Sequence, residues 1–524
     1  MLISQLSSGL TKLHKREVKM ETNSKLVPER KASNFREVYP IREPYVYAAV
    51  VTEPNTHRII YELIEPTLLA EEEEQLKEIK SILVEEIDVN LNEIETRKKA
   101  EEYLKNKISE IIKDYRLKIA EEAIDKLTYY IIRDFLGYGR IDPLMQDPLI
   151  EDISADGVNI PIYVWHRDYE SLPTNIIFKT SSELNSFIVR LAYLAKKNIS
   201  LSMPILDASL PDGSRIQMTY GSEITRRGST FTIRRFRVDP LTISDLLSFG
   251  TLSSEMAAYF WYAIENRASF LVAGGVAAGK TTILNCFSMF IKPGLKLVSV
   301  EDTAELNLPH ENWIPSVART GFGFEAKRSG SITLFDLLRA AVRQRPDYLI
   351  VGEIRGEEAY TLFQAMATGH LGLGTIHGES TSSVIHRLES EPMNIPRPLL
   401  TMINAIPVQL RTEVNGKPVR RTSSVTEILG IDPKTKELLT HEVYRWNPRN
   451  DSFEYSGHSY LLEEKMKQKG LTEKEVQDEL HRRKVVLDWM VKEGIRKYTD
   501  VVSVIRDYYA DPNRVFRKAR LGMS

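Results

Sequence analysis

The chain has 524 residues, and its 70 basic and 72 acidic side chains leave a formal net charge of −2 at pH 7. This balance provides no overall field that attracts nucleic acid, so any polyanion site must be local. The single cysteine, Cys286, excludes an internal disulfide and a Cys-x-x-Cys metal site. No window approaches the stretch of about 18 apolar residues that a membrane span needs. We therefore expect a cytoplasmic protein of two or three domains.

The first part of the chain is predicted to contain a flexible segment, a β-hairpin and a helical region, in this order. Residues 1–34 are polar and basic without periodicity, which predicts a flexible N-terminus. Two β-rich runs between Tyr39 and Pro66 flank a polar Glu53-Pro54-Asn55 turn and predict a hairpin. Apolar residues then recur at helical spacing, at Leu76, Ile79, Leu83, Ile87, Ile111, Ile112, Leu117 and Ile124. We predict a hairpin plus helical region over 35–149.

Three further regions follow in chain order. Over 150–240, short β-type runs surround a helix from about Ser181 to Lys197, which predicts an α+β N-terminal domain. Over 241–455, strands rich in Val, Ile and Leu alternate with helices, as in an α/β domain with a parallel sheet. Over 456–524 the spacing of apolar residues predicts a helical C-terminal region.

The strongest motif follows the apolar run Phe270 to Ala273, where Gly274-x4-Gly279-Lys280-Thr281 precedes a helical pattern. Strand, glycine-rich loop and helix together form a phosphate-binding loop, and the alternative is a tight turn without a ligand. Lys280 supplies charge to the β- and γ-phosphates, and Thr281 is the expected ligand of Mg²⁺. The predicted nucleotide-binding residues are Gly274, Gly275, Val276, Ala277, Ala278, Gly279, Lys280, Thr281 and Thr282.

Acidic residues end two further predicted strands. Glu301, Asp302 and Glu305 follow one of them, where carboxylates suit Mg²⁺ or a bound water, and the alternative is an acidic helix cap. Glu301 and Asp302 join Thr281 as predicted Mg²⁺ ligands, although which of the three carboxylates contacts the ion stays open. The apolar run Tyr348 to Val351 breaks at Gly352 and brings Glu353 to the end of its strand, where it is the predicted general base.

Other charged residues are predicted to complete the site. Arg355 could answer the charge of a phosphate or of Glu353, or form a surface ion pair. His370 and His377 flank a glycine-rich strand, a spacing that disfavours zinc, and we interpret them as phosphate sensors or as structural caps. Arg215 and Arg234 lie in alternating strand patterns and could reach together toward a cleft, whereas we interpret Arg226 and Arg235 as a solvated face.

Four segments in this order resemble one family. GGVAAGKT looks like the Walker A motif of secretion and pilus-assembly ATPases, VEDTAEL like their Asp box, LIVGEIR like their Walker B motif, and TGHLGLGTIHGES like their His box. The run from Tyr39 and the pattern from Arg483 to Met490 resemble the archaeal branch, which includes the archaellum motor. The four-cysteine zinc element of the bacterial branch is absent, since the chain has one cysteine.

The resemblance implies an N-terminal domain linked to a RecA-like domain, ATP and Mg²⁺ as cofactors, and a homo-hexameric ring. It implies a polytopic membrane platform protein as partner, at the inner face of the cell membrane. Arg215 and Arg234 match positions from which the family directs arginines toward the phosphates, and Glu301 and His377 join Glu353 as expected catalytic residues. The resulting hypothesis is a motor that assembles or rotates an archaeal type IV pilus-like filament, without a nucleic-acid partner. Alternatives are a RecA-like nucleic-acid translocase, an ATP-gated scaffold, and an archaellum-specific motor.

Overall fold

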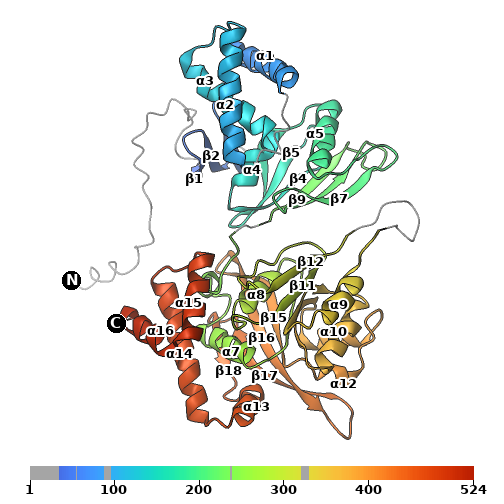
Figure 1. Cartoon of the computed structure of the whole chain (residues 1–524), viewed down its shortest axis with the longest axis vertical. Helices are drawn as coiled ribbons and strands as arrows, with labels where there is room; N and C mark the ends of the chain where they lie inside the picture. The colour runs from blue at the N-terminus through green and yellow to red at the C-terminus, as the bar shows by residue number, and fades with distance from the viewer. Residues whose placement is uncertain (1–34, 55, 88–95, 237–238, 320–329, 524) are drawn as a thin grey trace, which may run out of the picture. The chain divides into compact units, whose positions relative to one another are not determined.

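Two compact units, separated after Arg235, make up the chain. The computed structural model, drawn in Figure 1, describes residues 35–54, 56–87, 96–236, 239–319 and 330–523. Within these described residues, each unit has its own nine-stranded sheet. The predicted flexible N-terminus, residues 1–34, lies outside the described residues.

The sheet of the first unit has the strand order β1-β2-β3-β6-β5-β4-β9-β8-β7. Its strands are β1 (Phe35–Arg42), β2 (Val46–Thr52), β3 (Ile59–Ile64), β4 (Ile150–Ala155), β5 (Pro161–His166), β6 (Glu170–Ile177), β7 (Ile205–Ser209), β8 (Arg215–Thr219) and β9 (Thr230–Arg234). The predicted hairpin is confirmed as the antiparallel pair β2–β3. Tyr39, predicted to begin that hairpin, lies instead in β1, a further strand paired with β2. Tyr61 of β3 pairs with Thr174 of β6, so the hairpin extends the α+β sheet.

Three helices follow the hairpin, as the spacing of apolar residues predicts. They are α1 (Ala70–Glu86), α2 (Arg97–Asp114) and α3 (Glu121–Phe135). The described part of this unit also has η3 (Gly139–Ile141), α4 (Asp142–Gln146) and α5 (Ser181–Leu194). Leu76, Ile79 and Leu83 of α1 are buried against α2 and α3. Leu117, predicted to be helical, lies between α2 and α3.

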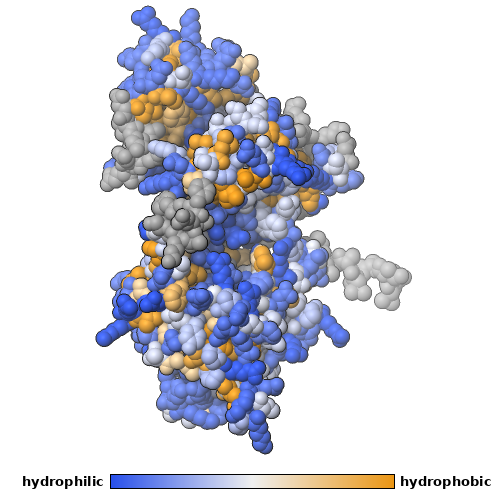
Figure 2. Space-filling view, turned by 90° about the vertical axis from the view of Figure 1, so that its right-hand side faces the viewer, coloured by the Kyte–Doolittle hydropathy of each residue, from blue (hydrophilic) through white to orange (hydrophobic). Residues whose placement is uncertain are grey.

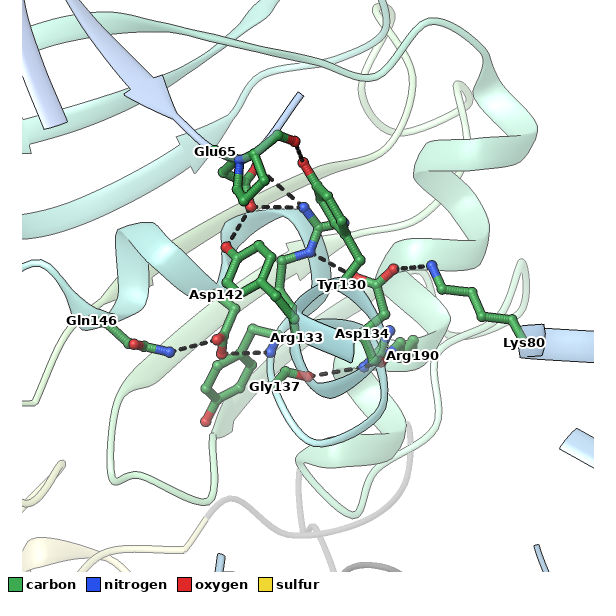
Figure 3. Close-up of polar contacts among 12 residues, drawn as sticks. Glu65, Lys80, Tyr130, Arg133, Asp134, Gly137, Asp142, Gln146 and Arg190 are labelled. Carbon is green, nitrogen blue, oxygen red and sulfur yellow. Dashed lines mark hydrogen bonds and ion pairs between the residues drawn. The ribbon is translucent and has the colours of Figure 1, made fainter. Parts of the chain in front are cut away.

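A polar network joins these helices to the sheet (Figure 3). Arg133 of α3 donates to Glu65, which directly follows β3, at 2.9 Å, and it also pairs with Asp134. Lys80 of α1 pairs with Asp134, and Arg190 of α5 donates to backbone carbonyls at the end of α3. Burial raises the pKa of Asp134, but the Arg133 and Lys80 cations outweigh burial and hold that pKa below its ordinary value.

An apolar surface is exposed beside β7, the edge strand of this sheet. Figure 2 views the side on which α5 and β7 lie in Figure 1, and it shows apolar side chains gathered on the first unit. The large apolar residues exposed in this region are Val189, Tyr193, Leu201, Met203, Ile205 and Ile224. Exposed apolar patches of this kind commonly mark association surfaces.

The second unit has the strand order β12-β11-β13-β14-β10-β15-β16-β17-β18. Its strands are β10 (Phe270–Gly274), β11 (Leu297–Glu301), β12 (Trp313–Val317), β13 (Tyr348–Ile354), β14 (Leu371–His377), β15 (Ala405–Val414), β16 (Lys417–Ile431), β17 (Leu438–Asn447) and β18 (Ser452–Tyr455). The first six in the sheet order run parallel, and β16 to β18 continue as an antiparallel meander. The apolar central strands are buried on both faces, as expected for a parallel sheet between helical layers.

Helices cover both faces of this sheet. They are α6 (Ile243–Ser248), α7 (Ser254–Glu265), α8 (Lys280–Ser288), α9 (Leu334–Arg343), α10 (Glu358–Ala367), α11 (Thr381–Glu389), α12 (Arg397–Leu400), α13 (Tyr460–Lys469), α14 (Glu473–Lys492), α15 (Tyr498–Ala510) and α16 (Pro512–Met523). Alternate residues of β10 enter different cores: Phe270 and Val272 pack with α7 and α8, and Leu271 and Ala273 with α9 and α10. The predicted C-terminal helical region packs into the first of these cores. Among the described residues, no helix is both long and apolar enough to cross a membrane.

Candidate nucleotide-binding site

The phosphate-binding loop lies between β10 and α8, at the carboxyl edge of the parallel strands. Gly274 ends β10 with φ 156°, and Gly279 precedes α8 with φ 89°, conformations that L side chains rarely adopt. A Cβ atom on Gly274 would also lie 2.7 Å from the carbonyl oxygen of Gln409 in β15. These constraints explain why the motif requires glycine at both ends of the loop.

The other loop residues lie where the motif predicts. Val276 is 77% exposed and Ala277 is exposed, whereas Ala278 is buried. Ala277 has φ 56°, so an alanine occupies the left-handed region. Thr281 and Thr282 lie half-buried in the first turn of α8. A turn of backbone N–H groups followed by a helix N-terminus fits a phosphate.

Lys280, the first residue of α8, donates a hydrogen bond from Nζ to the carbonyl oxygen of Gly275 at 2.8 Å. Burial lowers the pKa of Lys280, the carboxylates of Glu353 and Glu305 oppose this effect, and Arg387 adds to it. The structure therefore brings Glu353 and Glu305 into electrostatic range of the phosphate-loop lysine.

Glu353 is the penultimate residue of β13, which ends at Ile354, so it lies at the end of its strand as predicted. The pairing of β13 with β14 shifts register between Val351 and Ile354. An irregularity of this kind redirects side chains, which explains how Glu353 can be half-buried near Lys280 within a strand.

Glu301 ends β11 and is 2% exposed. Its Oε2 accepts hydrogen bonds from the backbone N–H groups of Glu305 (2.8 Å) and Leu306 (3.0 Å). Burial raises the pKa of Glu301 to about 7, although the two N–H donors act in the opposite direction. Its Cγ lies 3.1 Å from the position of a Cβ on Gly352, so Glu301 packs directly beside the strand that carries Glu353.

The predicted metal ligands have different surroundings. Asp302 forms an ion pair with Arg355, so the surface pairing that we considered for Arg355 is the interaction observed. One oxygen of Glu301 is occupied by backbone donors, and Thr281 contributes a single hydroxyl. In the part of the chain that the structure describes, no group of three or more His, Cys, Asp or Glu side chains could hold a metal. These residues fit Mg²⁺ only as isolated ligands of an ion held mainly by phosphate.

The two predicted histidines lie at opposite edges of the sheet. His377 ends β14, and the backbone N–H of the next residue, Gly378, donates to the carbonyl oxygen of Gly274, with nitrogen and oxygen 3.3 Å apart. His370 precedes β14, and its Nδ1 lies 3.2 Å from the carbonyl oxygen of Ala365 at the end of α10. Because a seven-residue strand spans about 20 Å, the structure does not bring His370 to the phosphate loop. Its observed role is that of a helix-end cap, the structural alternative.

Arg215 and Arg234 of the first unit lie directly opposite each other in the antiparallel pair β8–β9. Both are exposed, whereas Ile216 and Ile233 face the core. Arg234 also forms an ion pair with Asp152, with Nε to Oδ1 at 3.5 Å. The alternation that we predicted for these strands is confirmed.

We predicted that Arg226 and Arg235 lie on a solvated face. The prediction is confirmed for Arg226, which is exposed. The prediction was wrong for Arg235, which is half-buried and donates to the carbonyl oxygen of Ile150 at 2.9 Å and to that of Asp147. Arg235 follows directly after β9, where the adjacent β4 begins, and backbone acceptors are within its reach.

Two basic residues near the loop were missed from the sequence. Arg387 lies on α11, ten residues after His377, and influences the charge of Lys280. Arg420 of β16 donates from Nε to the carbonyl oxygen of Ala277 at 2.9 Å. The Asn415-Gly416 turn, a strong hairpin signal, could have placed Arg420 opposite β15, but not at the phosphate loop.

A phosphate loop at the carboxyl edge of a parallel sheet, beside strands that carry a glutamate at or next to their last residue, defines an α/β RecA-like ATPase domain, here preceded by an N-terminal domain. The family of Type II/IV secretion system proteins matches residues 138–411, and the PilB3-like C-terminal family matches residues 449–522. The chain therefore belongs to the type II/IV secretion ATPase family.

The chain is also similar to individual proteins of two organisms. An uncharacterised protein of Methanocaldococcus jannaschii is 37% identical over 90% of this chain and 88% of its own length. A second uncharacterised protein of that organism is 55% identical over 46% of this chain and 88% of its own length. A putative conjugal transfer protein of Mycobacterium tuberculosis is 31% identical over 49% of this chain and 73% of its own length.

Solved structures with matching regions include an ATPase of a type IV secretion system and a pilus motor. The VirB11 ATPase of Brucella suis is 22% identical, with 54% of this chain and 90% of that chain covered and a TM-score of 0.28. The pilus retraction motor PilT is 20% identical, with 55% and 81% covered and a TM-score of 0.38.

Proposed function

We propose that this protein is an ATP-hydrolysing motor that powers the assembly of an archaeal type IV pilus-like surface filament. The observation that carries the proposal is the placement of Glu353 and Glu305 within electrostatic range of Lys280 beside the phosphate loop. A carboxylate near the lysine that binds the terminal phosphates can also orient or deprotonate an attacking water. The PilB3-like family match over 449–522 supports a pilus system.

In this proposal the backbone N–H groups of residues 274–279 bind the phosphates of ATP. Lys280 exchanges its bond to the Gly275 carbonyl for the β- and γ-phosphates. Thr281 ligates Mg²⁺, which supplies charge neutralisation when bound, and Glu353 is the general base. Glu301, whose carboxyl group changes protonation near neutral pH, packs beside the strand that carries Glu353. His377, at the end of β14, acts as a sensor of the γ-phosphate.

We further propose a homo-hexamer in which Arg215 and Arg234 complete the phosphate site as it closes. The exposed apolar surface beside β7 supports association, because such patches mark interfaces. The partner that receives the motion is a polytopic membrane platform protein, with the motor held through it at the cytoplasmic face of the membrane. An archaellum motor is the alternative within the same family.

ATP hydrolysis by the purified full chain tests the proposal, measured together with its mass by light scattering and with the Glu353→Gln variant. We expect Mg²⁺-dependent hydrolysis that rises as the protein assembles and is lost in the variant. Hydrolysis that is absent under all assembly conditions would support an ATP-gated scaffold instead. Submicromolar binding of single-stranded DNA at moderate salt would favour a translocase, a possibility kept open by the relative named for conjugal transfer.

A further inference from the structure

The hairpin β15–β16 is attached directly to the phosphate loop. Gln409 of β15 pairs with Gly274, the first residue of the loop motif, in the parallel pair β10–β15. Asn415 and Gly416 close the hairpin with φ 53° and 75°, which places Arg411 and Arg420 directly opposite each other. Arg420 thus reaches the loop from a rigid element that is hydrogen-bonded to the loop's start.

Arg420 contacts the middle and the end of the loop. Its Nε donates to the carbonyl oxygen of Ala277 at 2.9 Å. Its Cδ lies 3.3 Å from the position that a Cβ on Gly279 would take, so its aliphatic stem lies against the last glycine. One side chain therefore spans the peptides from residue 277 to residue 279.

The residue that Arg420 contacts is in a strained conformation. Ala277 has φ 56°, and the left-handed region is unfavourable for an L residue with a Cβ. Its methyl group is exposed, so side-chain packing does not impose this conformation. The hydrogen bond from a charged guanidinium to the Ala277 carbonyl is stronger than a neutral one and can hold the peptide in place.

We propose that Arg420 is a positioning residue that holds the Ala277 peptide in its left-handed conformation and so keeps the loop N–H groups directed at phosphate. The inference rests on the proposed function, because it concerns the ATP site itself. When Arg420 is removed, Ala277 relaxes toward negative φ and the neighbouring N–H groups rotate away from the phosphate. Lysine is a poor replacement, since it lacks the planar Nε–H that contacts the carbonyl.

The role of Arg420 is tested by titrating the full-length protein with a fluorescent ATP analogue. We expect Arg420→Ala and Arg420→Lys to weaken binding about tenfold. Arg411→Ala removes the same charge from the facing strand and is the matched control, with near wild-type affinity expected. Unchanged circular dichroism and thermal unfolding show that each variant is folded.

A second substitution distinguishes an Arg420 that positions the Ala277 peptide from an Arg420 that attracts the phosphate charge directly. Glycine adopts the left-handed region readily, so Ala277→Gly makes the loop independent of the arginine. We expect the double variant Ala277→Gly/Arg420→Ala to recover most of the lost affinity, whereas an arginine that acted directly on phosphate charge would not be rescued. Equal affinities of Arg420→Ala and Arg411→Ala, or no recovery in the double variant, overturn the inference and leave the proposed function intact. Absence of ATP binding by the wild type overturns both.

Discussion

The ammonium group of Lys280 lies 2.8 Å from the carbonyl oxygen of Gly275, so the first residue of α8 turns back onto the start of its own loop. Burial lowers the pKa of this amine, while Glu353 and Glu305 act against burial. The lysine is therefore a cation directed into the loop concavity, where phosphate groups bind.

Lys280→Ala is expected to weaken ATP binding about 100-fold, because a charge-assisted hydrogen bond to phosphate contributes about 2 to 3 kcal/mol. Calorimetric titration with ATP measures the loss. Lys292→Ala, an exposed lysine just after α8, is the matched control. Equal affinity of the two variants would remove Lys280 from the binding site.

Glu353→Gln is expected to retain ATP binding and to lower turnover by about 10²- to 10⁴-fold, the usual contribution of a general base. Single-turnover hydrolysis measures the chemical step, and a fluorescent ATP analogue measures binding. Glu357→Gln, an exposed glutamate four residues later, controls for the change in charge. Turnover near the wild-type rate would exclude Glu353 as the base.

Arg215→Ala and Arg234→Ala are each expected to reduce turnover in the assembled protein by about 10³-fold while leaving each unit folded, as for arginines that stabilise transferred phosphate. The two side chains are adjacent on the exposed face of β8 and β9, so their removal creates no cavity in the core. Arg226→Ala, exposed in the same unit, is the control. Rates equal to that of the control would assign Arg215 and Arg234 to the solvated surface.

Glu301→Gln is expected to change how stability depends on pH. The pKa of Glu301 rises from an ordinary 4.5 to about 7 on folding, so the folded state retains a proton that the unfolded state releases. The free energy of unfolding of the wild type therefore falls by up to about 3 kcal/mol as pH increases from 4.5 to 7. Above pH 7 the stabilisation by the protonated Glu301 carboxyl group is fully lost. The amide does not titrate and its oxygen still accepts both N–H bonds, so the variant avoids this loss.

Calorimetric unfolding of both proteins between pH 5 and pH 8 measures this difference. The stability of the variant relative to the wild type should increase as pH rises, and this increase should persist above pH 7. Glu311→Gln, an exposed glutamate of the same unit, is the matched control. A constant difference across the range would show that Glu301 is ionised throughout.

Arg483→Met is expected to destabilise the second unit by about 3 kcal/mol, because it leaves carboxylates without their buried partner. Arg483 of α14 pairs with Glu265 of α7 and with Glu479, and its Cζ lies 5.1 to 5.4 Å from the ring centroids of three aromatic residues. Thermal unfolding measures the effect against Arg506→Met, an exposed arginine of α15. Equal stability would show that apolar packing alone fastens the C-terminal helices.

The parts of the fold predicted correctly have local signals. The phosphate loop follows from glycine spacing and an apolar strand, and Ile216 and Ile233 show by simple alternation which strand faces are buried. Arg235 was misplaced because its partners, the carbonyl groups of Asp147 and Ile150, are distant in sequence. For His370 the sequence left a phosphate sensor and a structural cap open, and its contact with the Ala365 carbonyl oxygen at the end of α10 favours the cap.

The sequence by itself determined the phosphate-binding motif, the order of strands and helices around it, and the family, since these depend on residue type and short spacing. Tertiary structure decided which charges meet. Asp302 pairs with Arg355 because β11 and β13 are neighbours in the sheet, and Arg420 reaches Ala277 across 143 residues through a hairpin joined to β10. Burial of Glu301, and with it a carboxyl pKa near neutral, likewise follows from packing between strands that no local pattern specifies.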